Sequence, residues 1–190
     1  MRTKLGLGLL LLVIASPVSA REVEGISLPE TLTVVGVEAP LMLNGAGVRK
    51  RFFIKVYVGA LYLPAKEASV EKILGSSGAK VVRMHVLYDE IEARKLADAW
   101  TDGVKANQGK TDFEALAAHL AEFNAMFRTV RRGEIMRIDL LPNGDTRVTI
   151  NEEPRGTVTG ADFQRALLKI WLGDHPADED LKRGMLGAKE

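Results

Sequence analysis

The chain contains no cysteine. Disulfide bonds, thiolate nucleophiles and cysteine-ligated metal sites are therefore excluded. The fold has to be stabilised by packing and other non-covalent contacts, and any chemistry has to come from other side chains.

An excess of charge of either sign is also lacking, since 26 lysines and arginines stand against 25 aspartates and glutamates. The cations are spread along the chain, so the sequence indicates no nucleic-acid partner. The histidines, His85, His119 and His175, lie far apart in the sequence and have no paired ligand three or four residues away. We therefore predict no metal site.

Motifs for phosphate binding and for nucleophilic serine catalysis are missing as well. The segment "NGAGVR" (44–49) lacks the Gly-Lys-Ser/Thr ending of a phosphate-binding loop. The segment "LGSSG" (74–78) does not have the Gly-x-Ser-x-Gly order of a nucleophile elbow. The sequence thus indicates no cofactor.

The longest apolar run, from Leu5 to Ala15, is shorter than the ~20 residues of a membrane-spanning helix. Arg2 and Lys4 precede it, and the small residues Ser19 and Ala20 follow it. This pattern favours a secretory signal peptide (residues 1–20, cleaved after Ala20) over an uncleaved membrane anchor. We therefore expect a periplasmic or secreted protein in which residues 21–190 form one domain without a transmembrane segment.

The rest of the chain alternates between strand-like and helix-like segments. Short β-branched runs predict strands, and apolar residues at helical spacing predict amphipathic helices, one of them opening with a Thr111–Glu114 capping box. The strands are expected at 31–37, 40–64 (two strands with a tight turn at Asn44-Gly45), 80–88, 134–151 (a hairpin) and 154–160, and the helices at 69–75, 89–109, 111–127, 161–173 and 178–187. This order indicates an α+β fold with an antiparallel sheet.

The most informative polar residues lie in the strand-like segment from Arg49 to Leu63. If it is one strand, its even positions are apolar and form core, whereas its odd positions include Arg49 and Tyr57 and form a mixed face. An arginine and a phenol together suit recognition of a carboxylate. On a single strand they would stand about 27 Å apart, so only a bend or turn could bring them together, and the pattern alone favours a solvated strand face.

Two segments resemble the chalcone isomerase family, and most closely its bacterial exported chalcone isomerase-like members. These are "NGAGVR…FIKVYVGALYLP" and "GADFQRALLKIWLGDHPADEDLK". The resemblance implies an open-faced sandwich, in which a large antiparallel β-sheet is covered on one face by a layer of α-helices. It also implies a ligand cleft between the sheet and the helices, which would explain the mixed face.

The family's functional positions are only partly kept in this sequence. Arg49 and Lys95 match the family arginine and lysine, Tyr57 replaces a threonine, and Glu92, Ala99 and Ile170 stand at the tyrosine, asparagine and C-terminal threonine positions. Ala99 and Ile170 cannot donate a hydrogen bond, and each lost donor typically slows such a reaction by orders of magnitude. Chalcone cyclisation is therefore not expected.

The fatty-acid-binding members of the family resemble this chain in pairing the arginine with a tyrosine. The resemblance thus implies a non-catalytic binder of a small hydrophobic acid, with Arg49, Tyr57 and Lys95 as ligand-binding residues. One alternative is an intramolecular lyase that acts on a chalcone-like enone through Arg49 and Lys95. The other is an interaction or assembly protein whose cleft is filled by side chains such as Trp100 and Phe53; no particular protein partner is indicated.

Overall fold

The computed structural model describes residues 20–188, so the expected signal peptide lies outside the described residues except for Ala20. Its strands are β1 (Ala20–Val23), β2 (Ile26–Pro29), β3 (Thr31–Leu32), β4 (Leu41–Arg51), β5 (Ile54–Leu63), β6 (Lys80–Val86), β7 (Glu90–Ile91), β8 (Val130–Arg131), β9 (Ile135–Leu140), β10 (Asp145–Ile150) and β11 (Glu153–Thr159). Its helices are α1 (Val70–Gly75), α2 (Ala93–Ala106), α3 (Lys110–Ala115), α4 (Ala117–Ala125), α5 (Ala161–Leu172) and α6 (Glu179–Met185). No helix in this part of the chain is long and apolar enough to cross a membrane.

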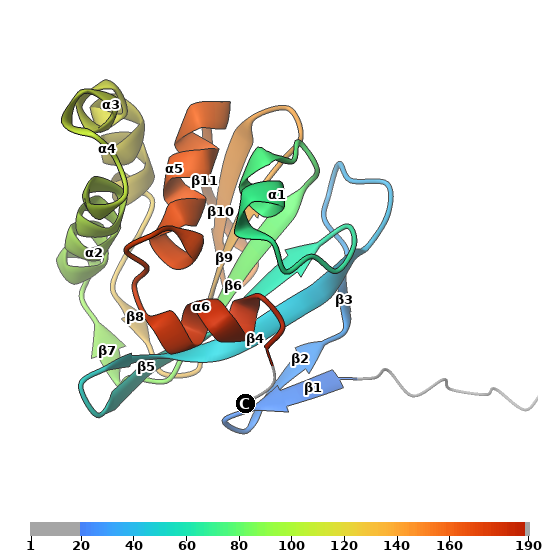
Figure 1. The fold of residues 1–190 in the computed structure, drawn as a ribbon. Coiled ribbons are helices and arrows are strands. Elements are labelled where there is room, and N and C mark those ends of the chain that lie inside the picture. Colours follow the sequence, from blue (N-terminus) through green and yellow to red (C-terminus); the bar gives the residue numbers. More distant parts are fainter. Residues whose placement is uncertain (1–19, 189–190) are drawn as a thin grey trace, which may run out of the picture.

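The main sheet has seven antiparallel strands in the order β11-β10-β9-β6-β5-β4-β3 (Figure 1). The helices lie over one face of it, and the large hydrophobic core fills the space between the two layers. On β5 this face carries Tyr57, Leu61 and Leu63, which are all buried. The predicted α+β fold with helices on one face of an antiparallel sheet is confirmed.

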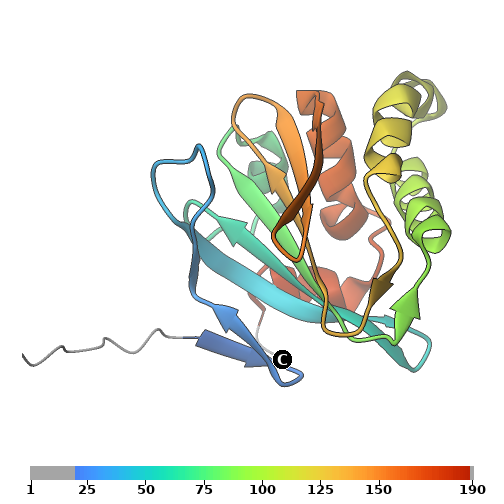
Figure 2. The same ribbon diagram turned by 180° about the vertical axis from the view of Figure 1, so that it is seen from behind.

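The opposite face of the sheet is also partly covered. A second hydrophobic cluster places Leu28 and Val34, from the N-terminal segment, against Val58, Ala60 and Tyr62 of β5. Both faces of β5 are therefore buried. Figure 2, the view from behind, shows the N-terminal segment (blue) along this side of the molecule.

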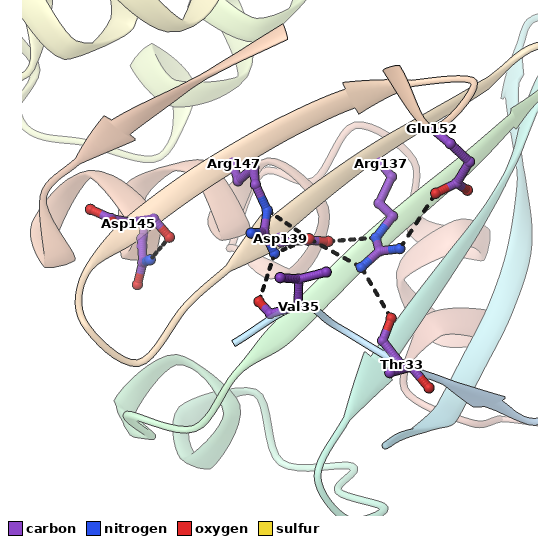
Figure 3. Close-up of polar contacts among 8 residues, drawn as sticks. Thr33, Val35, Arg137, Asp139, Asp145, Arg147 and Glu152 are labelled. Carbon is purple, nitrogen blue, oxygen red and sulfur yellow. Dashed lines mark hydrogen bonds and ion pairs between the residues drawn. The ribbon is translucent and has the colours of Figure 1, made fainter. Parts of the chain in front are cut away.

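A buried carboxylate extends this cover toward the far strands of the sheet. Arg137 Nε and Arg147 Nη2 donate to the Asp139 carboxylate at 2.6 and 3.0 Å (Figure 3). The same two arginines donate to the backbone oxygens of Thr33 and Val35. The sheet curls enough for the segment that follows β3, at one edge, to reach β9 and β10 near the other.

The prediction of a tight turn at Asn44-Gly45 is wrong. β4 continues through this dipeptide, and the chain reverses at Phe52-Phe53, because Arg51 and Ile54 are paired across the hairpin. The Asn44 side chain donates to the backbone oxygens of Glu67 and Met185 instead of closing a turn.

Other expectations fail at the level of individual elements. The strand predicted over residues 31–37 is confined to β3, because the residues after Leu32 do not pair with a neighbouring strand and cross the sheet instead. The helix expected from Thr111 begins at Lys110 after Gly109, so the capping box is not formed, and it breaks at Leu116 into α3 and α4. The hairpin expected over 134–151 is confirmed as β9 and β10.

Candidate ligand-binding cleft

Arg49 and Tyr57 lie directly opposite each other on β4 and β5. The Arg49 guanidinium carbon stands 5.8 Å from the centre of the Tyr57 ring, close enough for a cation–π contact. The separation of about 27 Å expected for a single strand is wrong because the turn at Phe52-Phe53 folds the segment back on itself. The hairpin thus brings together the pair that the sequence singled out.

Both side chains line a cavity of about 360 Å³ at this end of the sheet. Its volume lies at the small end of the ~300–1,000 Å³ typical of small-molecule sites. The β4–β5 hairpin and α2 supply most of the wall, and the rest comes from Tyr88, from β7, from Ile170 of α5 and from Ala177. The apolar lining residues are Phe52, Ile54, Val56, Ile91, Leu96, Ala99, Trp100, Ile170 and Ala177. The cavity is therefore an apolar cleft with a polar end.

The Tyr57 hydroxyl accepts one hydrogen bond and still has its own proton available for donating another. Trp171 Nε1 donates to the Tyr57 hydroxyl oxygen at 2.9 Å. Burial raises the pKa of the Tyr57 phenol above its ordinary value, although the Arg49 charge and the Trp171 hydrogen bond act in the opposite direction. The phenol is protonated at neutral pH, and its O–H remains available as a hydrogen-bond donor.

Two further donors in the lining are buried. Arg49 Nε and Trp100 Nε1 have no hydrogen-bond partner among the described residues. Buried polar groups are normally paired, so two unpaired donors on residues that line the cavity make this region a candidate site for an acceptor. The lining also contains one carboxylate, Glu90, but it is paired with Arg131 at 2.8 Å. The polar end of the cleft thus offers hydrogen-bond donors and positive charge.

Lys95, the third expected ligand-binding residue, also lines the cavity but lies at its rim. Its side chain is 64% exposed and pairs with Glu92 at 3.2 Å. Glu92, at the position of the family tyrosine, precedes α2 and is not part of the lining. Ala99 and Ile170 do border the same cavity, where they present only carbon.

Sequence analysis missed the polar role of the tryptophans. Trp100 and Trp171 are buried among aromatic rings, as residues at helical core positions should be. The Trp171 indole N–H nevertheless donates to the Tyr57 hydroxyl, and the Trp100 indole N–H has no hydrogen-bond partner within residues 20–188. Phe53, expected as a possible filler of the cleft, is instead fully exposed at the hairpin tip.

No group of metal-ligating side chains occurs within residues 20–188. His85 lies on the sheet face away from the helices, and His119 packs against Phe163 with ring centres 5.8 Å apart. The cleft itself contains no histidine in its lining.

The fold defines a class of protein in which helices cover one face of a curled antiparallel sheet, and here a cleft is lined by residues of both layers. Residues 20–187 match the chalcone isomerase-like family, and the chain belongs to that family. The family resemblance found in the sequence is thereby confirmed, whereas bacterial origin and export remain predictions.

A solved structure with the same architecture is that of the Arabidopsis thaliana fatty-acid binding protein AtFAP1. It matches this chain with a TM-score of 0.71 and 18% sequence identity, over 85% of this chain and 92% of the plant protein. At this level of identity the similarity shows the fold alone. No curated protein sequence matches the chain.

Proposed function

We propose that this protein is a non-catalytic binder of a small hydrophobic carboxylate, such as a fatty acid. Arg49 and Tyr57 hold the carboxylate, and the acyl chain lies along the apolar wall of the cleft. Lys95 contributes positive charge at the rim. We also propose that the protein works after export and removal of residues 1–20.

The observation that carries this proposal is the set of donors without acceptors at one end of the cleft. The Tyr57 hydroxyl accepts from Trp171 and keeps its own proton for donation to a ligand. Arg49 Nε is buried and unpaired within the described part of the chain. An anionic acceptor satisfies both groups at once, and a charge-assisted hydrogen bond is roughly twice as strong as a neutral one.

The apolar wall supports a ligand with a hydrocarbon part. Val56, Leu96 and Ile170 border the same cavity as the donors, so a bound molecule must be polar at one end and apolar along its length. A fatty acid has this shape. AtFAP1, which shares the fold, is itself described as a fatty-acid binding protein.

The lyase alternative has less support from the cleft. A lyase would have to use Arg49 and Lys95, and Lys95 is engaged with Glu92 at the exposed rim. The assembly alternative requires a filled cleft, yet Phe53 points into solvent and the cavity remains open.

The proposal is tested by native mass spectrometry and lipid extraction of the processed protein, purified as the parent and as Arg49→Gln. We expect a co-purified fatty acid in the parent and at least roughly tenfold less in the variant. Arg183→Gln, which changes an exposed arginine on α6, is the matched control and should retain the acid. Equal amounts of acid in all three proteins, or none in the parent, would contradict the proposal. The intact mass also reports whether cleavage occurs after Ala20.

A further inference from the structure

The tip of the β4–β5 hairpin exposes large apolar side chains. Phe52 is 88% exposed, Phe53 is 101% exposed and Ile54 is 49% exposed. The hairpin projects from the lower left of the molecule in Figure 1. Neither phenylalanine belongs to the hydrophobic clusters formed by residues 20–188. The two phenylalanine rings therefore contribute little to the packing of the domain.

The backbone of the turn also disfavours these residues. Phe52 has a φ of +56° and is the first central residue of the two-residue turn between Arg51 and Ile54. Glycine is the usual residue at that position of a hairpin turn, and a bulky side chain there is strained. Strained residues that do not pack against the protein point to a role outside the fold.

Cations surround the apolar tip. Lys50 and Arg51 precede it on β4, and Lys55 follows it on β5. Lys55 is paired with Glu24 at 2.5 Å. No carboxylate in the described structure lies within ion-pair distance of the Lys50 or Arg51 side chains; Asp178 accepts only from the backbone N–H of Lys50. The tip therefore presents exposed aromatic rings next to two cations, Lys50 and Arg51, that no carboxylate of the described structure pairs with.

We propose that this hairpin tip docks the protein onto the surface of an anionic lipid bilayer. The Phe52 and Phe53 rings enter the boundary between headgroups and acyl chains, and the flanking cations bind lipid phosphates. A second copy of the chain packed tip to tip fits poorly, because its cations would meet the same cations. The apolar rings and the cations together match the chemistry of a bilayer surface that carries negative charge.

Docking in this way would orient the cleft toward the bilayer. Arg51, Phe52 and Ile54 belong both to the tip and to the lining of the cleft. A hydrophobic ligand could then pass between the bilayer and the cleft with little exposure to water. The docking itself does not depend on what the cleft binds, so it stands or fails separately from the proposed function.

Co-sedimentation of the processed protein with lipid vesicles tests the proposal. We expect binding to phosphatidylcholine–phosphatidylglycerol vesicles that weakens with added salt, and much weaker binding to phosphatidylcholine alone. The double variant Phe52→Ser/Phe53→Ser should bind at least about tenfold more weakly. Lys50→Gln/Arg51→Gln should lose a comparable factor, mostly on the anionic vesicles.

Val35→Ser is the matched control, because Val35 is an apolar residue that is 79% exposed but lies beside Arg147 of β10 and not on the β4–β5 hairpin. It should leave vesicle binding unchanged. Phe52→Gly should unfold at the same temperature as the parent or higher, since glycine relieves the turn, while binding vesicles more weakly. Loss of binding therefore cannot be attributed to misfolding.

Three results would overturn the proposal: no binding of the parent to anionic vesicles, undiminished binding of the phenylalanine variant, or an equal loss with Val35→Ser. Light scattering provides a further check. A parent dimer that the phenylalanine variant converts to monomers would assign the tip to self-association and would also overturn it.

Discussion

Tyr57 and His85 lie on opposite faces of the sheet, and burial favours the neutral form of both side chains. Burial raises the pKa of Tyr57, which preserves its proton for the cleft. On the other face, burial and the neighbouring Arg83 charge lower the pKa of His85 to about 4. His85 Nε2 has no hydrogen-bond partner within residues 20–188, so no protein acceptor stabilises a proton on that nitrogen.

His85 should make the stability of the protein depend on pH between its ordinary pKa of 6.5 and about 4. In this range the unfolded chain binds a proton at His85 and the folded protein does not, so the free energy of unfolding falls as the pH falls. His85→Leu should weaken this decline, measured by urea unfolding at about pH 7 and about pH 5. His175→Gln, which changes an exposed histidine, should keep it. Identical declines in the parent and His85→Leu would contradict this assignment.

At the scale of elements, the close approach of α6 to β4 explains why glycines gather in the "NGAG" segment. A Cβ atom added at Gly45 would lie 2.1 Å from the backbone oxygen of Gly184 and 2.8 Å from that of Met185. Both contacts are to backbone, so no change of rotamer can relieve them. Gly45 is therefore required for the packing of α6 against β4. The Asn44-Gly45 dipeptide is typical of a turn but does not form one here.

Gly45→Ala should destabilise the protein by at least ~2 kcal/mol, because overpacking against a rigid backbone typically costs ~1–3 kcal/mol. Thermal unfolding should show a midpoint several degrees lower, at ~2–4 °C per kcal/mol for a chain of this size. Gly75→Ala provides the control, since its added methyl group would meet nothing within 4 Å. An unchanged midpoint for Gly45→Ala would mean that α6 can move away from β4 at little cost.

The two hairpins show which turns the sequence could predict. Pro142, Asn143 and Gly144 are turn residues between strand-like runs, and the β9–β10 hairpin follows directly from them. Phe52-Phe53 is an apolar pair without turn chemistry, so the β4–β5 reversal was missed. The juxtaposition of Arg49 and Tyr57 depends on that reversal. Residue chemistry could thus suggest the pair, whereas only the structure shows that it is assembled.

At the scale of the whole molecule, one buried carboxylate and the two arginines that it binds hold the N-terminal segment against the sheet. Asp139, whose side chain is 2% exposed, pairs with Arg137 and Arg147, which in turn bind the backbone at Thr33 and Val35. The order of strands and helices predicted the α+β class. It could not predict this cover, because the contacts join residues more than 100 positions apart in the sequence.

Asp139→Asn should lower the free energy of unfolding by about 3 kcal/mol, because it leaves the two arginines without their buried counter-charge. Hydrogen exchange should quicken at the amide of Val37, which donates to Val34 within the covering segment. Asp89→Asn, at an exposed pair with Arg132, is the control and should change stability by less than ~1 kcal/mol. If both variants are equally stable, the carboxylate does not hold the cover in place.

The central claim, that Arg49 recognises a carboxylate, is tested most directly by calorimetric titration of the delipidated parent and Arg49→Gln. Each protein is titrated with a fatty acid and with the alcohol of the same chain length. If Arg49 binds the carboxylate, the parent should bind the acid at least about tenfold more tightly than the alcohol. Arg49→Gln should lose this preference while still binding the alcohol. An undiminished preference for the acid in Arg49→Gln would contradict carboxylate recognition by Arg49, and so would equal affinity of the parent for the two ligands.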